Sequence, residues 1–333
     1  MKLTTDFKKA TSFLSIFFFF VTNSLATITL AEEIKIPEQE LLIWRVDTKP
    51  GSLYSVYILG SYHVGKNCEI NSPAFQHAFK DAENVVFEVD SIQNPSIYNE
   101  AQKSLIKIIR EKGVPTNANE SLKGILDNQT YELLRQKADA AEFSLENVAD
   151  LKPWVFMLMY TSLMSQSEHK FECGLDSMIA QKAQAKNKDI AGLESLDYQF
   201  DKISDLYLSM DRDETLEALE WIAQAESTEE ISEYFSQEID TLTNSIDAGN
   251  VEYLESDINS WCQEAIEECE SILLTRNRNW IPQIEELLEQ KADSLVVVGA
   301  GHLVGEQSVI QLLKQKGYRV RRFYHDFRLT EEK

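Results

Sequence analysis

The stretch "SLVVVGAGHLVGEQ", residues 294–307, joins a run of valines to a glycine-rich turn and a histidine. The apolar run predicts a buried strand that ends at the Gly-Ala-Gly preceding His302. The stretch "VYILGSYHVG", residues 56–65, has the same order: an apolar strand, a glycine, two residues and then His63. The chain therefore carries Gly-x-x-His twice, although it has only five histidines.

Each Gly-x-x-His is followed by a predicted helix and then by a predicted strand. The first helix, residues 71–83, has Ser72 as its cap and Pro73 at its first position, and a strand at 84–90 follows. The second helix is predicted over 305–317. Strand, helix and strand in succession usually form a right-handed crossover between parallel strands. The repeat therefore favours a sheet with parallel strands.

The rest of the chain places a helical middle between two sheet-forming ends. Residues 40–48 and 52–60 flank the turn signal "KPG" and predict a hairpin. The fold class is α/β, with a mixed, mostly parallel sheet flanked by helices and a large helical middle region. We expect one domain over residues 32–333, with sheet-forming segments and helical regions as follows: sheet at 40–90, 188–195 and 294–324; helices at 97–183 and 197–291.

Four side chains fall at the carboxyl ends of these predicted strands. Ligand groups in open α/β sheets lie at that edge. His63 and His302 follow their strands, Glu88 is near the end of "VVFEVD", and Glu194 comes just after "IAGL" in the strand predicted at 188–195. If the strands are parallel and adjacent, two imidazoles and two carboxylates meet. The alternative for Glu88 is a solvent-facing position in an edge strand with alternating burial.

Imidazoles and a carboxylate are the usual ligands of catalytic zinc, manganese or cobalt. We expect His63, Glu88 and His302 to bind a divalent ion, which would acidify a water and polarise the carbonyl that it attacks. Glu194 is then a candidate general base. A nucleotide-binding loop at "GAGHLVG" is excluded, since the Gly-x-Gly-x-x-Gly spacing and a P-loop lysine are both missing.

The amino-terminal segment predicts an exported protein, and the net charge limits its partners. The formal net charge of -23 argues against nucleic acid and anionic membranes as partners. Residues 1–31 have a basic start, an apolar run of ten residues at 12–21 and then small residues, as in a signal peptide. Cleavage is expected after Ala31 or Ala26, leaving a periplasmic or secreted protein without a stable membrane span. An uncleaved membrane anchor is the alternative.

Export places the four cysteines in an oxidising compartment, where disulfides form. Three pairings are possible, and we predict Cys262–Cys269 together with Cys68–Cys173. On one straight helix, Cys262 and Cys269 would lie about 10 Å apart, which is too far for a bridge. They pair only if the intervening residues interrupt the helix. Four free buried thiols are the alternative.

The chain resembles the TraB/GumN family, which includes the animal Tiki proteins. The resemblance covers about residues 40–325 and is carried, in chain order, by Gly60-x-x-His63, "VVFEVD", "LKPW" (151–154), "CGLD" (173–176), "GLES" (192–195), "TRNRNW" (275–280) and "GAGHLVGEQSVIQLLKQKGY" (299–318). It implies a sheet with flanking helices related to erythromycin-esterase-like and haem-binding ChaN-like folds. For the Tiki branch it implies a metal-dependent protease.

Carried over residue by residue, the resemblance places His63, Glu88 and His302 at the motif positions. Arg276 and Asn277 match the family's Arg-Asn pair, which orients the site or a substrate carboxylate. The expected function is an exported metal-dependent hydrolase that acts on a peptide or protein substrate. The alternatives are a non-catalytic protein that sequesters a peptide or haem, and a metal-free hydrolase with a histidine as general base.

Overall fold

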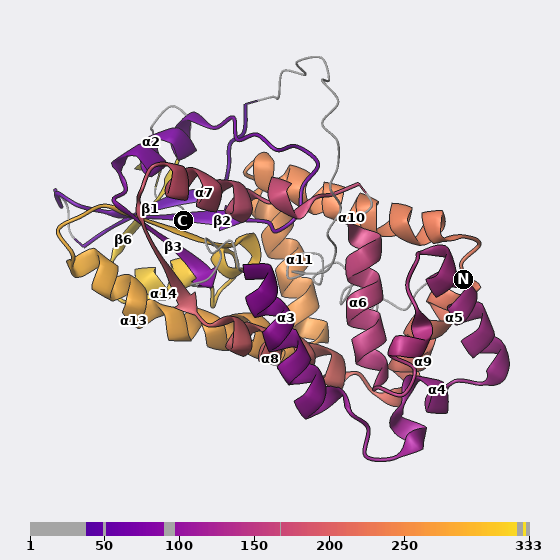
Figure 1. Cartoon of the computed structure of the whole chain (residues 1–333). Coiled ribbons are helices and arrows are strands. Elements are labelled where there is room, and N and C mark those ends of the chain that lie inside the picture. Colours follow the sequence, from indigo (N-terminus) through magenta and orange to yellow (C-terminus); the bar gives the residue numbers. More distant parts are fainter. Residues whose placement is uncertain (1–37, 49–50, 90–96, 167, 325–328, 331–333) are drawn as a thin grey trace.

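A seven-stranded sheet forms one end of the molecule (Figure 1). The computed structural model describes residues 38–48, 51–89, 97–166, 168–324 and 329–330. The strand order is β4-β3-β5-β2-β1-β6-β7. The strands are β1 (Ile43–Asp47), β2 (Val56–Ser61), β3 (Asn84–Val89), β4 (Asp189–Glu194), β5 (Ser294–Gly299), β6 (Arg319–Phe323) and β7 (Leu329–Thr330).

Most strands of the sheet run in the same direction. β4, β3, β5 and β2 pair in parallel. β1 is antiparallel to both β2 and β6, so β6 runs with the parallel group, and only β1 and β7 run against it. The predicted α/β class with a mixed, mostly parallel sheet is confirmed. So is the hairpin of β1 and β2, although Lys49 and Pro50 of its turn lie outside the described residues.

Helices cover both faces of the sheet, which explains why its central strands are apolar throughout. α2 (Pro73–Asp81) and α7 (Leu175–Ala185) pack on one face, whereas α13 (Thr275–Glu289) and α14 (Val309–Gln315) pack on the other (Figure 1). All six residues of β2 and all six of β5 are buried. The valine run of β5 therefore lies in the middle of the core.

Local capping explains where these helices begin. Ser72 caps α2 by accepting a hydrogen bond from the Phe75 amide, and Pro73 is its first residue, as predicted. The predicted helix at 305–317 is too long at its amino end. α14 begins only after Ser308, whose hydroxyl accepts from the Gln311 amide. Gly305 has φ +87°, which is incompatible with a helical start at that point.

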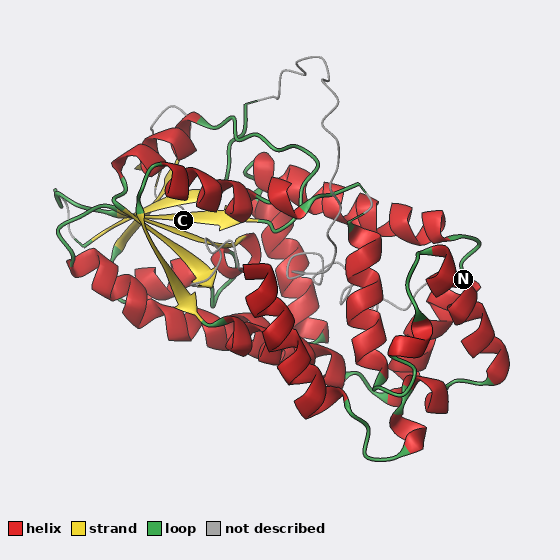
Figure 2. Cartoon of the chain, viewed as in Figure 1, coloured by secondary structure: helices red, strands yellow, loops and turns green. Residues whose placement is uncertain are grey.

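The middle of the chain is helical, as predicted, and extends away from the sheet (Figure 2). Its α-helices are α3 (Ile97–Ile108), α4 (Leu122–Ile125), α5 (Asn128–Ala140), α6 (Pro153–Ser165), α8 (Leu196–Ser209), α9 (Arg212–Gln224), α10 (Thr228–Asp247), α11 (Val251–Glu264) and α12 (Ile266–Cys269). The short helical turns are η1 (Ile109–Gly113), η2 (Ala118–Glu120), η3 (Leu145–Asn147), η4 (Phe171–Cys173), η5 (Glu270–Leu274) and η6 (Ala300–Leu303). α6 is buried on nearly all sides, which fits its uncharged sequence.

Both predicted disulfides are present. Cys68 and Cys173 have Cα atoms 4.2 Å apart and connect the loop after β2 to the turn before α7. Cys262 and Cys269 have Cα atoms 5.0 Å apart. The required break in the helix is at Ala265, whose backbone leaves the helical region between α11 and α12. The disulfides are consistent with an extracytoplasmic protein.

The two disulfides are expected to differ in their contribution to stability. Cys68 and Cys173 are separated by 105 residues, and Cys262 and Cys269 by seven. A disulfide stabilises the folded protein by constraining the unfolded chain. This contribution is about 4.7 kcal/mol for a closed loop of ~100 residues and below ~3 kcal/mol for loops shorter than ~15 residues. Denaturation of Cys68→Ser/Cys173→Ser and of Cys262→Ser/Cys269→Ser should show the larger loss for the first pair. Equal losses of stability in the two double variants would contradict the prediction that the bridge closing the longer loop contributes more.

No helix among the described residues is long and apolar enough to cross a membrane. The signal peptide predicted for residues 1–31 lies outside the described residues.

Candidate functional site

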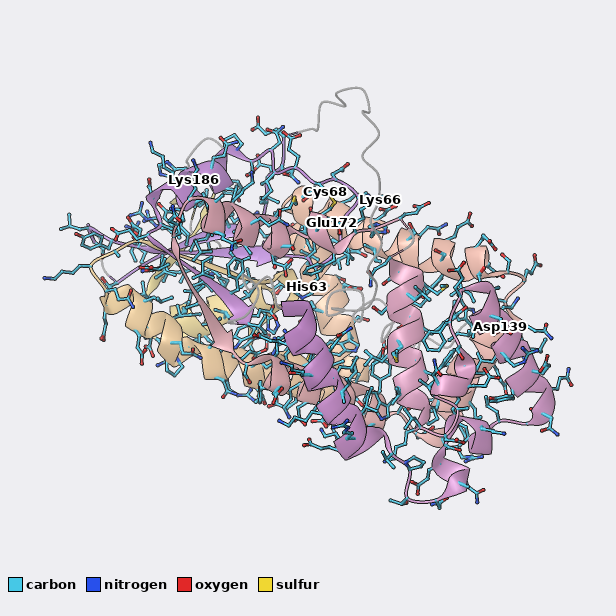
Figure 3. The ribbon with its side chains drawn as sticks, viewed as in Figure 1. His63, Lys66, Cys68, Asp139, Glu172 and Lys186 are labelled. Atoms are coloured by element: carbon cyan, nitrogen blue, oxygen red, sulfur yellow. A yellow bond between two sulfur atoms is a disulfide. The ribbon has the colours of Figure 1, made fainter. Side chains whose placement is uncertain are left out.

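The four side chains predicted at the sheet edge come together there. His63 follows β2, Glu88 lies in β3, Glu194 ends β4, and His302 lies in η6 directly after β5. Because these four strands are neighbours in the sheet and parallel, their carboxyl ends meet. In Figure 3, His63 lies at the end of the sheet that faces the helical region, with Asp139 far away in that region.

Glu88 lies at the centre of the site and is 4% exposed. One carboxylate oxygen accepts from the Gly299 amide at 2.6 Å. The other accepts from Gln199 at 2.9 Å and from Arg276 at 2.7 Å. Burial acts to raise the pKa of Glu88, but the positive charge of Arg276, followed by the nearby histidines and the Gly299 amide, lowers it to about 2. The alternative of a solvent-facing Glu88 is therefore wrong, and the group is a buried carboxylate.

Arg276 connects three of the predicted site residues. Its guanidinium donates to Glu194 at 2.6 and 3.0 Å, to Glu88 at 2.7 Å and to Nε2 of His302 at 3.1 Å. The side chain is 1% exposed. Trp280, one turn later on α13, donates its indole N–H to Glu194 at 3.1 Å. Burial raises the pKa of Glu194, against the effect of Arg276, so this carboxylate takes up a proton more readily than Glu88.

His302 is held as a neutral imidazole. Its Nδ1 lies 2.6 Å from the amide oxygen of Asn277. Arg276 can only donate, so Nε2 of His302 accepts from it, and Nδ1–H donates to Asn277. Complete burial and the Arg276 charge lower the pKa of His302 to about 3. Asn277 is fixed in turn by donating to the Gln307 carbonyl at 3.0 Å. The adjacent Arg-Asn pair of α13 thus orients His302 through both ring nitrogens.

His63 has a different partner, Asp176, which was not among the site residues predicted from the sequence. Its Nδ1 lies 2.5 Å from a carboxylate oxygen of Asp176, at the start of α7. Burial acts to lower the pKa of His63, but the adjacent Asp176 carboxylate outweighs it, and the pKa is raised. Gly174 allows this approach, because a Cβ at that position would collide with the His63 carbonyl oxygen. The two imidazoles therefore have pKa values shifted in opposite directions.

Sequence reasoning missed three residues of the site: Asp176, Gln199 and Trp280. Asp176 and Trp280 lie within the stretches "CGLD" and "TRNRNW" that carry the family resemblance, so motif order was an available signal for both. Gln199 lies on α8 in an ordinary amphipathic pattern, and we find no local signal for it.

The space inside the site is small. A cavity of about 10 Å³ is lined by Ser61, His63, Phe87, Glu88, Val89, Asp176, Gln199 and Val297. A larger pocket of about 310 Å³ adjoins the site at Asn277, with η6 and the residues that follow it as one wall. A ligand in that pocket would lie beside the amide that orients His302.

The imidazole and carboxylate side chains are suitable ligands for the expected divalent ion. However, the side chains would have to move before they could hold it. Anchoring through Nδ1 is typical of metal-bound imidazoles, and both His63 and His302 are anchored in this way. However, the Arg276 cation donates to Nε2 of His302 and to Glu88. Within the described residues, no group of three or more His, Cys, Asp or Glu side chains is arranged to hold an ion. An ion would bind only after Arg276 turns away from His302.

The lowered pKa values of His302 and Glu88 predict that the folded protein loses stability at acid pH. The unfolded His302 imidazole takes up a proton near pH 6.5 and the folded one near pH 3, so its contribution to stability decreases as the pH falls through this range. The contribution of Glu88 decreases as the pH falls from about 4.5 to about 2. The raised pKa of His63 has the opposite sign: its contribution is present below pH 6.5 and is lost as the pH rises through the folded value.

His302→Gln should therefore flatten the pH dependence of unfolding. Between pH 6.5 and 4.5 only the unfolded His302 gains a proton, so the variant should lose a slope of about 1.4 kcal/mol per pH unit. Urea denaturation of both proteins across this range measures the slopes. Parallel curves would show that His302 titrates normally in the folded protein.

Comparison with known proteins agrees with the resemblance in sequence. The model of the TraB/PrgY/gumN family matches residues 42–322. No curated protein and no solved structure matches the chain, so the likeness to erythromycin-esterase and ChaN-like folds stays a prediction. The matched range extends from β1 to β6 and contains every residue of the site described above. The chain therefore belongs to the TraB/PrgY/gumN family.

Proposed function

We propose that the protein is an exported hydrolase that cleaves peptide bonds at the cluster of His63, Glu88 and His302. The observation that carries the proposal is the anchoring of both imidazoles through Nδ1, by Asp176 and Asn277. This fixes the ring orientations and leaves Nε2 of each histidine as the nitrogen that can bind an ion or exchange a proton. Nε2 of His302 lies 3.8 Å from Glu88, and His63 lines a cavity together with Glu88.

In the metal-dependent form of the proposal, His63, Glu88 and His302 would hold manganese, cobalt or zinc. When bound, the ion would supply a more acidic water and polarise the scissile carbonyl. Asp176 and Asn277 would keep the imidazoles oriented, and Arg276 would remain paired with Glu194 while releasing His302. The partner is then a peptide or protein substrate.

One observation favours a metal-free form of the same hydrolase. Arg276 already supplies the positive charge between Glu88 and His302. His63, oriented by Asp176, would act as the general base or acid, as imidazoles held by a carboxylate do. Arg276 would balance the charge of Glu88 and Glu194 during the reaction.

The experiment is a turnover assay on protein purified without chelator. A library of quenched fluorescent peptides is incubated with the protein as isolated, after dialysis against a chelator, and after return of manganese, cobalt or zinc. Turnover that is lost on chelation and restored by one of the ions supports the metal-dependent form. Turnover that survives chelation supports the metal-free form. Absence of turnover under every condition, with peptide binding retained, would reject the hydrolase in favour of a sequestering protein.

A further inference from the structure

Ser61 is a buried residue of the sheet edge to which no role has been given so far. It is the last residue of β2, is 1% exposed and pairs in register with Gly299 of β5. The Gly299 amide is the one that donates to Glu88. Ser61 also lies two residues before His63, and both residues line the same small cavity.

The Ser61 hydroxyl has no hydrogen-bond partner among the described residues. An unpaired buried hydroxyl costs free energy, so buried polar atoms are nearly always satisfied by protein or by ordered water. Ser61 lines the cavity of about 10 Å³ that it shares with His63, Glu88, Asp176 and Gln199. A space of about 10–15 Å³ holds one water molecule, provided that two to four polar groups surround it.

We infer that this cavity binds one water molecule, held by the Ser61 hydroxyl, and that this water is the nucleophile of the site. The identity of the water as nucleophile rests on the proposed hydrolase function, whereas its binding does not. Ser61 is a less suitable nucleophile, because an attacking hydroxyl requires a base within hydrogen-bond distance, and its oxygen has no such partner here.

In the reaction, the water oxygen forms a bond to the carbonyl carbon and the carbon–nitrogen bond of the peptide breaks. In the metal-free form, in which Nε2 of His63 carries no ion, one proton of the water passes to this atom and then to the leaving amine, and the products are a carboxylic acid and an amine. Ser61 is thus a positioning residue, which holds the water between His63 and Glu88.

Three proteins test the inference: the wild type, Ser61→Ala and Ser294→Ala. Ser294 is a matched control, since it is a buried serine at the opposite end of the same sheet. A high-resolution crystal structure of the wild type should show a water within hydrogen-bond distance of the Ser61 hydroxyl, and this water should be lost or displaced in Ser61→Ala. Misplacing a reacting group costs about 100-fold in rate. The kcat of Ser61→Ala should fall by about that factor with little change in KM, and Ser61→Thr should recover part of the loss.

Several results would overturn the inference. A wild-type cavity without a water removes its structural basis, whatever the activity. An unchanged kcat in Ser61→Ala, or an equal loss in Ser294→Ala, removes the positioning role. Covalent labelling of Ser61 by a fluorophosphonate would identify a serine nucleophile instead. If the wild type shows no turnover on any peptide, the proposed function fails, and the crystal structures still decide whether Ser61 holds a water.

Discussion

Replacing Arg276 with methionine is expected to lower the free energy of unfolding by about 3–5 kcal/mol, the usual cost of removing one partner from a buried ion pair. Arg276 is 1% exposed and is the cation paired with the buried carboxylates of Glu88 and Glu194. Methionine keeps much of the side-chain volume but leaves two buried negative charges without compensation. Lysine should restore only part of the stability, since it cannot reproduce the planar guanidinium, which donates to Glu88, Glu194, His302 and the Ile272 carbonyl.

The matched control is Arg278→Met, two residues later on α13. Arg278 is 43% exposed and pairs with Glu270 at the surface. Exposed pairs contribute about 0–1 kcal/mol, so the control should differ little from the wild type. Urea denaturation at pH 7 measures all the variants. Adding Glu88→Gln and Glu194→Gln to Arg276→Met should restore stability, because neutral amides need no cation. Equal effects of Arg276→Met and Arg278→Met would mean that the buried network does not stabilise the fold.

Loss of the central carboxylate is expected to have the largest effect on activity. Glu88→Gln keeps the shape of the side chain and removes the charge that Arg276, His302 and His63 all face. We expect kcat/KM to fall by about 100-fold or more, the cost of misplacing reacting groups, because Arg276 and the two imidazoles lose the charge between them. His63→Ala and His302→Ala should lose activity to a similar extent, because each removes one of the two anchored imidazoles.

His77→Ala is the matched control for the histidine variants. His77 lies on α2 and is partly exposed, where it pairs with Asp81 and packs its ring against Phe323. It should retain wild-type kcat/KM. Circular dichroism and gel filtration establish that each variant is folded. Folded His63→Ala/His302→Ala with wild-type turnover would exclude this cluster as the site of hydrolysis.

The net negative charge of the whole chain does not enter the predictions for the site variants. The formal net charge of -23 is spread over a surface of many carboxylates, whereas the site combines two glutamates with one buried arginine. The chemistry of the site therefore depends on local pairing and not on the charge of the whole chain.

The sequence by itself determined the arrangement of the sheet edge. The two Gly-x-x-His stretches, with Glu88 and Glu194 at the ends of their strands, predicted which side chains would meet, and the structure brings them together. Local physical chemistry was sufficient here: apolar runs define buried strands, and parallel neighbours place their carboxyl ends at one edge. The Ser72 cap of α2 was predictable because capping depends on residues next to the helix start. The even number of cysteines predicted disulfides because an oxidising compartment was expected.

Only the tertiary structure decided the state of each group at that edge. Asp176 reaches His63 from 113 residues away, and Arg276 reaches Glu88 from 188 residues away. These partners shift the pKa of His63 upward and that of His302 downward, although both histidines follow the same motif. Burial and the identity of the nearest charge set these shifts, and both depend on distances through space that no local pattern encodes.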